Sequence, residues 1–321
     1  MKRRTNYVMA ALVFVLTMVI MNMSAVIISS FAVLVGTRAK GAQGGYDAAQ
    51  FLMSNLNFYT CLIYVITGSV FVLWYYFAFI EKKGVSMYMA EQTRKLKGAD
   101  FGWIALLTLA VQHAVSLILT LIGILLPSSM ENYTEMIETS GVSDYSLLWV
   151  IGTVILPPIV EETIFRGLIY RYMRRAGLAF LAANLVQAVL FGLFHMNLVQ
   201  GIYAACLGFL LGYLAYRYDS ILIPIAMHSM FNLCGTVVVE LENRFLPGVL
   251  IGFLILVSIP ATVFLLMKIY RETEEKIAGA GYGPPEEHAG AEKAAGSGGE
   301  GANMTTEIPN SNTGTIQEEE Q

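Results

Sequence analysis

The chain has 321 residues, of which 56% are hydrophobic and 14% are charged, and its formal net charge is −4. Ordinary soluble domains contain about 45–50% apolar and about 25% charged residues, so the composition excludes a soluble globular protein. Nucleic-acid-binding proteins are excluded with it. The three cysteines are an odd number scattered through apolar stretches, which fits neither a disulfide framework nor a zinc-ligand cluster.

Long apolar segments fill most of the chain from residue 7 to residue 268. A helix needs about 20 apolar residues to cross the roughly 30 Å hydrocarbon layer of a membrane. Eight such segments can be marked, of which the fourth to sixth are short or weakly bounded: Tyr7–Val35, Asn57–Ile80, Phe101–Leu126, Ser146–Val160, Leu178–Phe194, Leu198–Tyr216, Ile221–Val239 and Val249–Met267. The sequence therefore predicts an all-α, polytopic transmembrane helical bundle of about eight spans.

The first segment follows Lys2, Arg3 and Arg4, as the apolar core of a signal peptide does. Its apolar run is about twice the 7–15 residues usual in signal peptides, so we expect it to remain as a membrane span.

The distribution of Lys and Arg predicts the orientation, because short cytoplasmic loops collect positive charge. With the N-terminus in the cytoplasm, eight spans place 17 of the 20 Lys and Arg residues on the cytoplasmic side. The other three are Arg38, Lys40 and Arg244. We therefore expect a multi-pass protein of the plasma membrane with both termini in the cytoplasm.

The composition changes at the C-terminus. Residues 272–321 hold 11 of the 24 acidic residues but only Lys276 and Lys293 among the basic ones, and large apolar residues are almost absent after Gly279. Such a segment buries too little apolar surface to offset the entropy of ordering it. We predict a transmembrane helical domain at 1–271 and a disordered acidic cytoplasmic tail at 272–321.

Charged side chains inside membrane spans are costly and usually mark a functional site. Glu161, Glu162 and Arg166 lie at the end of the fourth segment. Glu162 and Arg166 are four residues apart and share a helix face, where an ion pair reduces the cost of burying them. Glu161 is rotated by about 100° and is left for acid or base chemistry. Pro157 and Pro158 directly before it should loosen the helix.

Two histidines and one asparagine complete the inventory. His195 ends the fifth segment, and His228 lies four residues before Asn232, on the same helix face. If the fourth and fifth segments form a hairpin turning near Gly177, Glu161 and His195 lie roughly 24 and 27 Å from the turn, at similar heights. A base, two imidazoles and an amide in one region are a hydrolytic set of groups.

These residues form three motifs in order: EExxxR from Glu161 to Arg166, FxxxH from Phe191 to His195, and HxxxN from His228 to Asn232. In this, the chain resembles the CAAX protease and bacteriocin-processing (CPBP or Abi) family of intramembrane peptidases, which is related to type II CAAX prenyl endopeptidases. The resemblance covers about residues 145–240.

The resemblance implies roles for these side chains. Glu161 would activate the attacking water, His195 would help to hold or polarise it, and His228 with Asn232 would stabilise the oxyanion. Glu162 with Arg166 would brace the site.

The motifs leave a metal cofactor open, because the HExxH helix of common zinc proteases is absent. If a divalent metal such as Zn²⁺ is bound, Glu161, His195 and His228 are the expected ligands.

The resemblance favours a glutamate-dependent intramembrane endopeptidase that hydrolyses a hydrophobic or lipidated peptide near the cytoplasmic face of the bilayer. Two alternatives stay open. One is a non-catalytic membrane interaction or bacteriocin-immunity protein on the same scaffold, and the other is a proton-coupled transporter in which Glu161 and the histidines form a relay. The sequence does not predict the oligomeric state.

Overall fold

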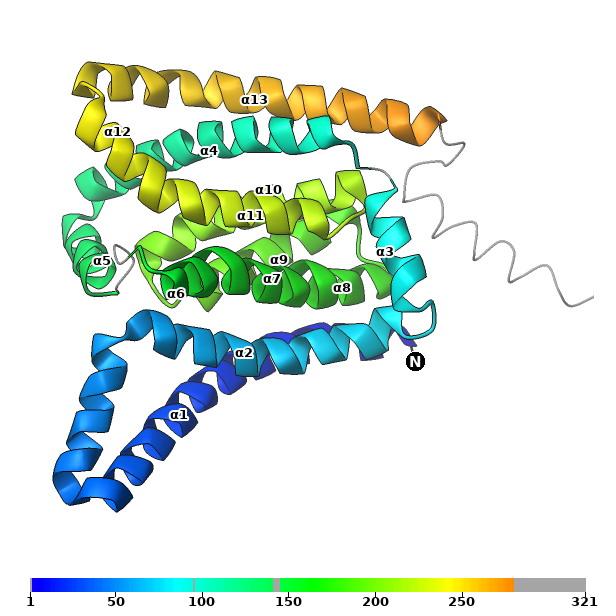
Figure 1. Ribbon diagram of the computed structural model, residues 1–321. Helices are drawn as coiled ribbons and strands as arrows, with labels where there is room; N and C mark the ends of the chain where they lie inside the picture. Colours follow the sequence, from blue (N-terminus) through cyan, green and yellow to red (C-terminus); the bar gives the residue numbers. More distant parts are fainter. Residues whose placement is uncertain (1, 95, 141–144, 280–321) are drawn as a thin grey trace, which may run out of the picture. The chain divides into compact units, whose positions relative to one another are not determined.

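A computed structural model of the protein describes residues 2–94, 96–140 and 145–279. Every regular element in these ranges is helical (Figure 1). The helices outside the central segment are α1 (Lys2–Ser54), α2 (Leu56–Tyr75) with the π-helical turn η1 (Tyr76–Ile80), α3 (Val85–Thr93), α4 (Gly98–Leu125), α5 (Pro127–Thr139), α9 (Phe180–Phe194), α10 (Leu198–Tyr218), α11 (Leu222–Leu233) with η4 (Cys234–Val238), α12 (Val239–Phe245) and α13 (Gly248–Gly279).

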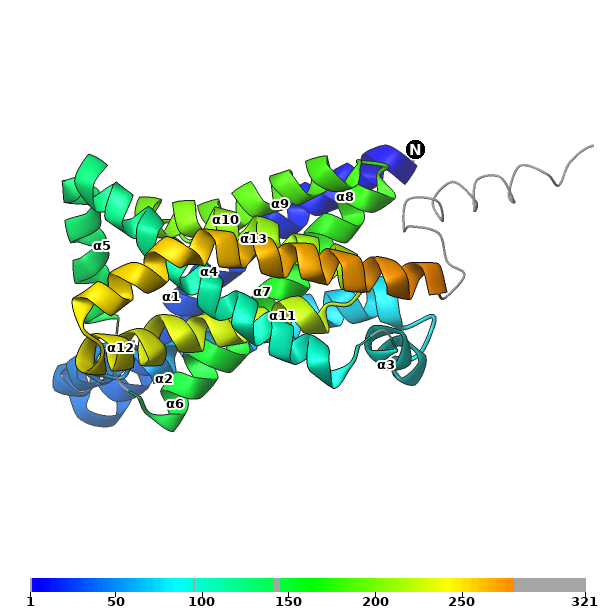
Figure 2. The ribbon, with the colours of Figure 1, turned by 90° about the horizontal axis from the view of Figure 1, so that it is seen from above.

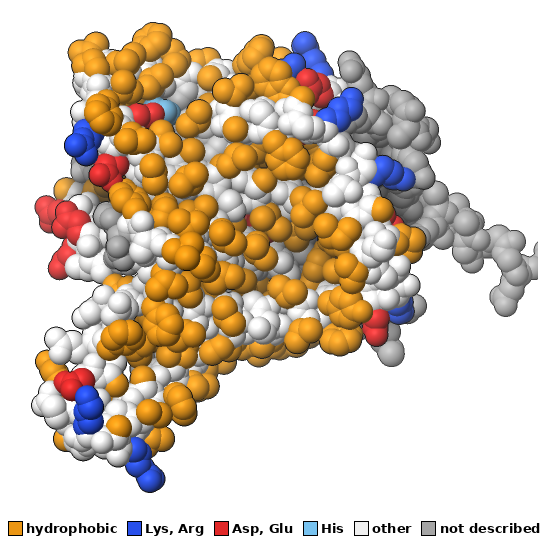
Figure 3. Space-filling view, in the orientation of Figure 1, with side chains coloured by type: hydrophobic (Ala, Val, Ile, Leu, Met, Phe, Trp, Pro, Cys, Tyr) orange, Lys and Arg blue, Asp and Glu red, His pale blue; other side chains and the backbone are white. Residues whose placement is uncertain are grey.

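Seven helical segments of the described residues are long and apolar enough to cross a membrane. They correspond to seven of the eight predicted spans, and the remaining one, the fifth, is the shorter apolar helix α9. Large hydrophobic side chains cover much of the face seen in Figure 3, far more than a soluble protein exposes. The chain is a multi-pass α-helical membrane protein.

The two ends of the helical part differ from the sequence prediction. Helix α1 continues to Ser54 across a sharp reversal at Lys40 and Gly41, where Gly41 has a φ of 68°. Only glycine adopts such a φ readily, so the chain turns there and a second helical arm returns towards α2 (Figure 1). At the other end, α13 continues past Arg271 to Gly279. The rest of the predicted acidic tail, 280–321, lies outside the described residues.

The fourth predicted span is the central segment of the fold. It runs from Leu147 to Arg175 through α6 (Leu147–Trp149), η2 (Val150–Ile155), α7 (Leu156–Glu162), η3 (Thr163–Tyr170) and α8 (Arg171–Arg175). It is the most buried of the spans, and α7 packs against both α2 and α11 (Figures 1 and 2). π-Helical turns inside α-helices are frequent at functional sites.

The predicted hairpin after the fourth span is present. Gly177, with a φ of 85°, forms the turn between α8 and α9. Helix α9 then packs along α10 more extensively than any other pair of helices in the described chain. This packing brings the end of α9 back beside η3, and α10 leads to α11, which packs against α7.

Candidate active site

A buried carboxylate lies at the centre of the candidate site. Glu162 on α7 is fully buried, and its Oε1 accepts a bond from Nη1 of Arg166 at 2.7 Å. The same oxygen lies 2.9 Å from Nδ1 of His228 on α11. The predicted Glu162–Arg166 ion pair is therefore formed, and it also fixes an imidazole from another helix. Charge-assisted bonds of this kind are roughly twice as strong as neutral ones.

Glu161 is only 4% exposed and points to a different set of partners, as the helix geometry predicts. Its Oε1 accepts a hydrogen bond from the phenol of Tyr64 on α2 at 2.5 Å. Its Oε2 is buried without a hydrogen-bond partner among the described residues and lies 3.8 Å from Nε2 of His228. One carboxylate oxygen is held and the other is free for chemistry.

The tautomer of His228 follows from its bond to Glu162. A carboxylate ion-paired to arginine can only accept, so Nδ1 of His228 carries the hydrogen in that bond. In its neutral form, His228 then presents the lone pair of Nε2 towards Oε2 of Glu161, which is also an acceptor. One molecule with two hydrogen-bond donors can bond to both of these acceptors, which are 3.8 Å apart. A water oxygen, for example, can lie about 2.8 Å from each of them.

His195 directly follows α9 and is half-buried. Its Nδ1 lies 2.8 Å from the carbonyl oxygen of Phe191. The ring of Phe191 packs edge-on against both histidine rings, with centroids 5.0 Å from His195 and 5.7 Å from His228. The guanidinium of Arg166 lies 4.6 Å from the centre of the same ring. Phe191 thus links the FxxxH motif to the other two.

Asn232 contacts the central segment rather than either glutamate. Its side-chain Nδ2 donates to the carbonyl oxygen of Thr153 at 2.9 Å. An amide nitrogen has two hydrogens, so one N–H of Asn232 remains for another acceptor. The predicted motifs therefore meet at the central segment, with His228 closest to the carboxylates.

A buried polar network behind Arg166 was not expected from the sequence. Nη2 of Arg166 and Nε2 of Gln187 both donate to the carbonyl oxygen of Gly208, at 2.8 and 2.9 Å. Gln187 also donates to Asn184, whose amide donates to the carbonyl of Phe209. The ion pair on the central segment is therefore tied to the α9–α10 hairpin. The sequence did contain a sign of this network, because Asn184 and Gln187 are three residues apart on one face of an apolar helix.

A metal site is not assembled by the predicted ligands. Among the described residues, no group of three or more His, Cys, Asp and Glu side chains could hold a metal ion. The donors that do approach are Oε2 of Glu161 and Nε2 of His228, whereas zinc sites have at least three protein ligands. The groups that the structure brings together are a carboxylate, an imidazole and hydrogen-bonding side chains.

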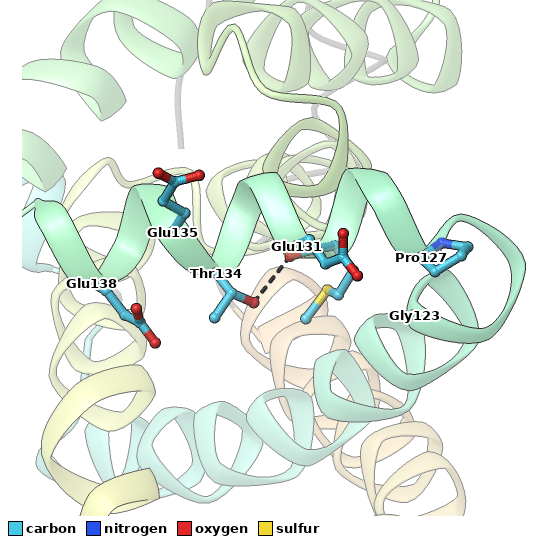
Figure 4. A pocket seen from close by; sticks show the side chains of 7 residues that line it. Gly123, Pro127, Glu131, Thr134, Glu135 and Glu138 are labelled. Carbon is cyan, nitrogen blue, oxygen red and sulfur yellow. Dashed lines mark hydrogen bonds between the residues drawn. The ribbon is translucent and has the colours of Figure 1, made fainter.

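A separate hollow lies on another part of the protein. It has a volume of about 460 Å³ and is lined from α4 and α5 by Gly123, Pro127, Met130, Glu131, Thr134, Glu135 and Glu138. Figure 4 shows its glutamates along α5 and the bond from Thr134 to the carbonyl of Met130. None of the predicted site residues lines this hollow.

The fold and the site together define the class: a multi-pass helical membrane protein with a buried Glu/His site on a π-interrupted helix. Residues 143–234 match the family model described as "Type II CAAX prenyl endopeptidase Rce1-like". This segment contains all three motifs, so the predicted resemblance is confirmed over that part of the chain.

A relative from Bacillus subtilis (strain 168), named "Putative membrane peptidase YdiL", is 34% identical over 95 residues. The alignment covers 30% of this chain and 38% of the relative, so the chain spans well under half of that protein's length. No solved structure matches the chain.

Proposed function

We propose that this protein is an intramembrane endopeptidase in which Glu161 is the general base that activates a water molecule. The observation that carries the proposal is the pairing of Glu161 Oε2 with His228 Nε2, two buried acceptors 3.8 Å apart. The family match of residues 143–234 and the relative named as a membrane peptidase support peptide-bond hydrolysis as the reaction.

The reaction begins with a water that donates one hydrogen to each acceptor. Glu161 takes one proton as the water oxygen bonds to the carbonyl carbon of the scissile peptide, and the π electrons move to the carbonyl oxygen. The tetrahedral intermediate then collapses as Glu161 returns the proton to the peptide nitrogen and the C–N bond breaks. The products are a carboxylic acid and an amine. Glu161 is ionised again as soon as it has returned the proton to the nitrogen, and the product acid loses its own proton to solvent.

The remaining groups have supporting roles in this scheme. Glu162 fixes the tautomer of His228, so His228 can hold the water molecule. The family resemblance implied this role for His195. The second N–H of Asn232 stays as the candidate donor to the oxyanion. His195 has its Nδ1 hydrogen directed at the carbonyl of Phe191, so in its neutral form it presents Nε2 as an acceptor. Removing one such donor lowers kcat about 10²- to 10³-fold in other hydrolases.

We propose a hydrophobic or lipidated peptide as substrate, reached near the cytoplasmic face of the plasma membrane. Glu161, Glu162, His228 and Asn232 lie on helical segments long enough to span a bilayer, and a substrate that partitions into the membrane has direct access to side chains at that depth. The excess of Lys and Arg on one side supports cytoplasmic termini.

The test is cleavage of a panel of lipidated and unlipidated hydrophobic peptides by the detergent-purified protein in H₂¹⁸O, with products identified by mass. Wild type is compared with His228→Gln and with Glu240→Gln, a carboxylate on α12 outside the site. We expect one ¹⁸O in the new carboxylate and at least a 10²-fold loss for His228→Gln. Glu240→Gln should keep the wild-type rate.

The other outcomes separate the alternatives. Cleavage that the His228 variant retains in full would contradict the assigned site, and loss of cleavage with a chelator would show a metal requirement. Absence of cleavage across the panel, with proton-driven uptake in vesicles that Glu161→Gln removes, would favour the transporter. Absence of both, with specific capture of a membrane protein partner, would favour the interaction or immunity protein.

A further inference from the structure

We propose that Tyr64 is a positioning residue of this site, which holds Oε1 of Glu161 so that Oε2 acts as the base. The inference rests on the proposed function and adds to it a helix that the matched segment does not contain. Tyr64 lies on α2, whereas the family match covers residues 143–234. The phenol donates to Oε1 of Glu161 at 2.5 Å.

The packing of α2 on the central segment fixes where Tyr64 lies. Gly68, one turn after Tyr64, has no side chain, and a Cβ there would lie 2.7 Å from Cγ2 of Val160. One turn before Tyr64, Cys61 contacts Gly152, where an added Cβ would lie 3.0 Å from the Cys61 sulfur. These two close contacts are on the same face of α2 as Tyr64 and place it beside Glu161.

The hydrogen bond selects between two chemically equal oxygens. A carboxylate with neither oxygen held can rotate about its last side-chain bond and present either atom. In this site the phenol engages Oε1, and Oε2 faces Nε2 of His228. A hydrogen bond to a charged acceptor is stronger than one to a neutral acceptor, so this bond holds the chosen orientation of the carboxylate firmly.

Loss of the phenol hydroxyl therefore has a consequence that can be measured. The carboxylate gains freedom, which lowers kcat more than it changes KM, because the geometry of proton transfer is affected rather than substrate binding. A residue that only filled space would not produce this split between kcat and KM when replaced by phenylalanine.

The experiment compares Tyr64→Phe with Tyr59→Phe in the purified full chain. Tyr59 is on the same helix, and its phenol bonds to the Ala25 carbonyl and to Ser29 of α1, away from Glu161. We expect Tyr64→Phe to lose about 10- to 100-fold in kcat, the range set by one bond to a charged group, with a much smaller change in KM. Tyr59→Phe should retain the wild-type kcat and KM.

A second readout does not depend on turnover. A hydrophobic carbodiimide reacts with accessible carboxyl oxygens, and peptide mass spectrometry locates the label. At one fixed pH we expect Glu161 to be labelled faster in Tyr64→Phe than in wild type and Tyr59→Phe, because Oε1 is no longer held by the phenol. An unchanged kcat and an unchanged labelling rate in Tyr64→Phe would overturn the inference. Faster labelling in Tyr64→Phe, together with a wild-type protein that cleaves nothing, would instead contradict the proposed function alone.

Discussion

The side-chain amide of Asn232 occupies the backbone hydrogen-bonding position that two prolines leave open, because its Nδ2 lies 2.9 Å from the carbonyl oxygen of Thr153. In an α-helix this carbonyl would accept from residue 157, and in a π-helix from residue 158. Both residues are proline and have no N–H. Asn232 therefore joins α11 to the central segment at the point where that segment is loosened, one turn before Glu161.

Replacement of Asn232 tests this brace. Asn232→Ala leaves the Thr153 carbonyl without a donor, and we expect the free energy of unfolding to fall by about 1 kcal/mol or more. The control is Asn22→Ala. Its amide donates to the carbonyl of Met18 four residues earlier in α1, at an exposed position. Denaturant unfolding in detergent micelles should show little change for Asn22→Ala, and equal effects of the two variants would contradict the brace.

The buried ion pair should matter far more than an exposed one. Arg166→Met leaves Glu162 charged, fully buried and without its arginine, and we expect a loss of about 3–5 kcal/mol. Lys83→Met removes the partner of Glu91 from an exposed pair of similar length, 2.9 Å against 2.7 Å, and should cost under about 1 kcal/mol. Thermal melting in one detergent compares both variants. Similar melting shifts would show that the Arg166 pair is not buried as described.

A single methyl group added at Gly212 should destabilise the α9–α10 hairpin. A Cβ there would lie 1.9 Å from Oδ1 of Asn184, which is held in the network behind Arg166. We expect Gly212→Ala to destabilise the protein by roughly 1–3 kcal/mol. Gly252→Ala on α13, where a Cβ meets nothing within 4 Å, should be neutral or stabilising because alanine favours helix. The same melting assay checks both, and a neutral Gly212→Ala would contradict the close packing.

Much of the fold could be predicted because hydropathy reports directly on burial in a membrane. The apolar lengths located the spans, and the four-residue spacing of Glu162 and Arg166 predicted their ion pair. The sequence did not predict the reversal at Gly41 or the amphipathic helix α5. Long apolar runs mark membrane spans, and neither of these features is marked by one.

The site was harder to predict than the fold, because its geometry depends on contacts between distant helices. Spacing along one helix shows which residues share a face but not which helix they meet. Asn232 was expected to serve an oxyanion, and its contact with Thr153 depends on how α11 crosses the central segment. Tyr64 was missed because a tyrosine in an apolar span is usual, and the partner that distinguishes it is 97 positions away.

The role of Glu161 as the base is tested by the turnover of one cleaved peptide by Glu161→Gln beside Glu91→Gln. The first substitution keeps the size of the side chain but removes the base, whereas the second makes the same change at an exposed ion pair. We expect at least a 10²-fold loss of kcat for Glu161→Gln with an unchanged melting temperature, and wild-type turnover for Glu91→Gln. Turnover by Glu161→Gln within a few-fold of wild type would show that Glu161 is not the base.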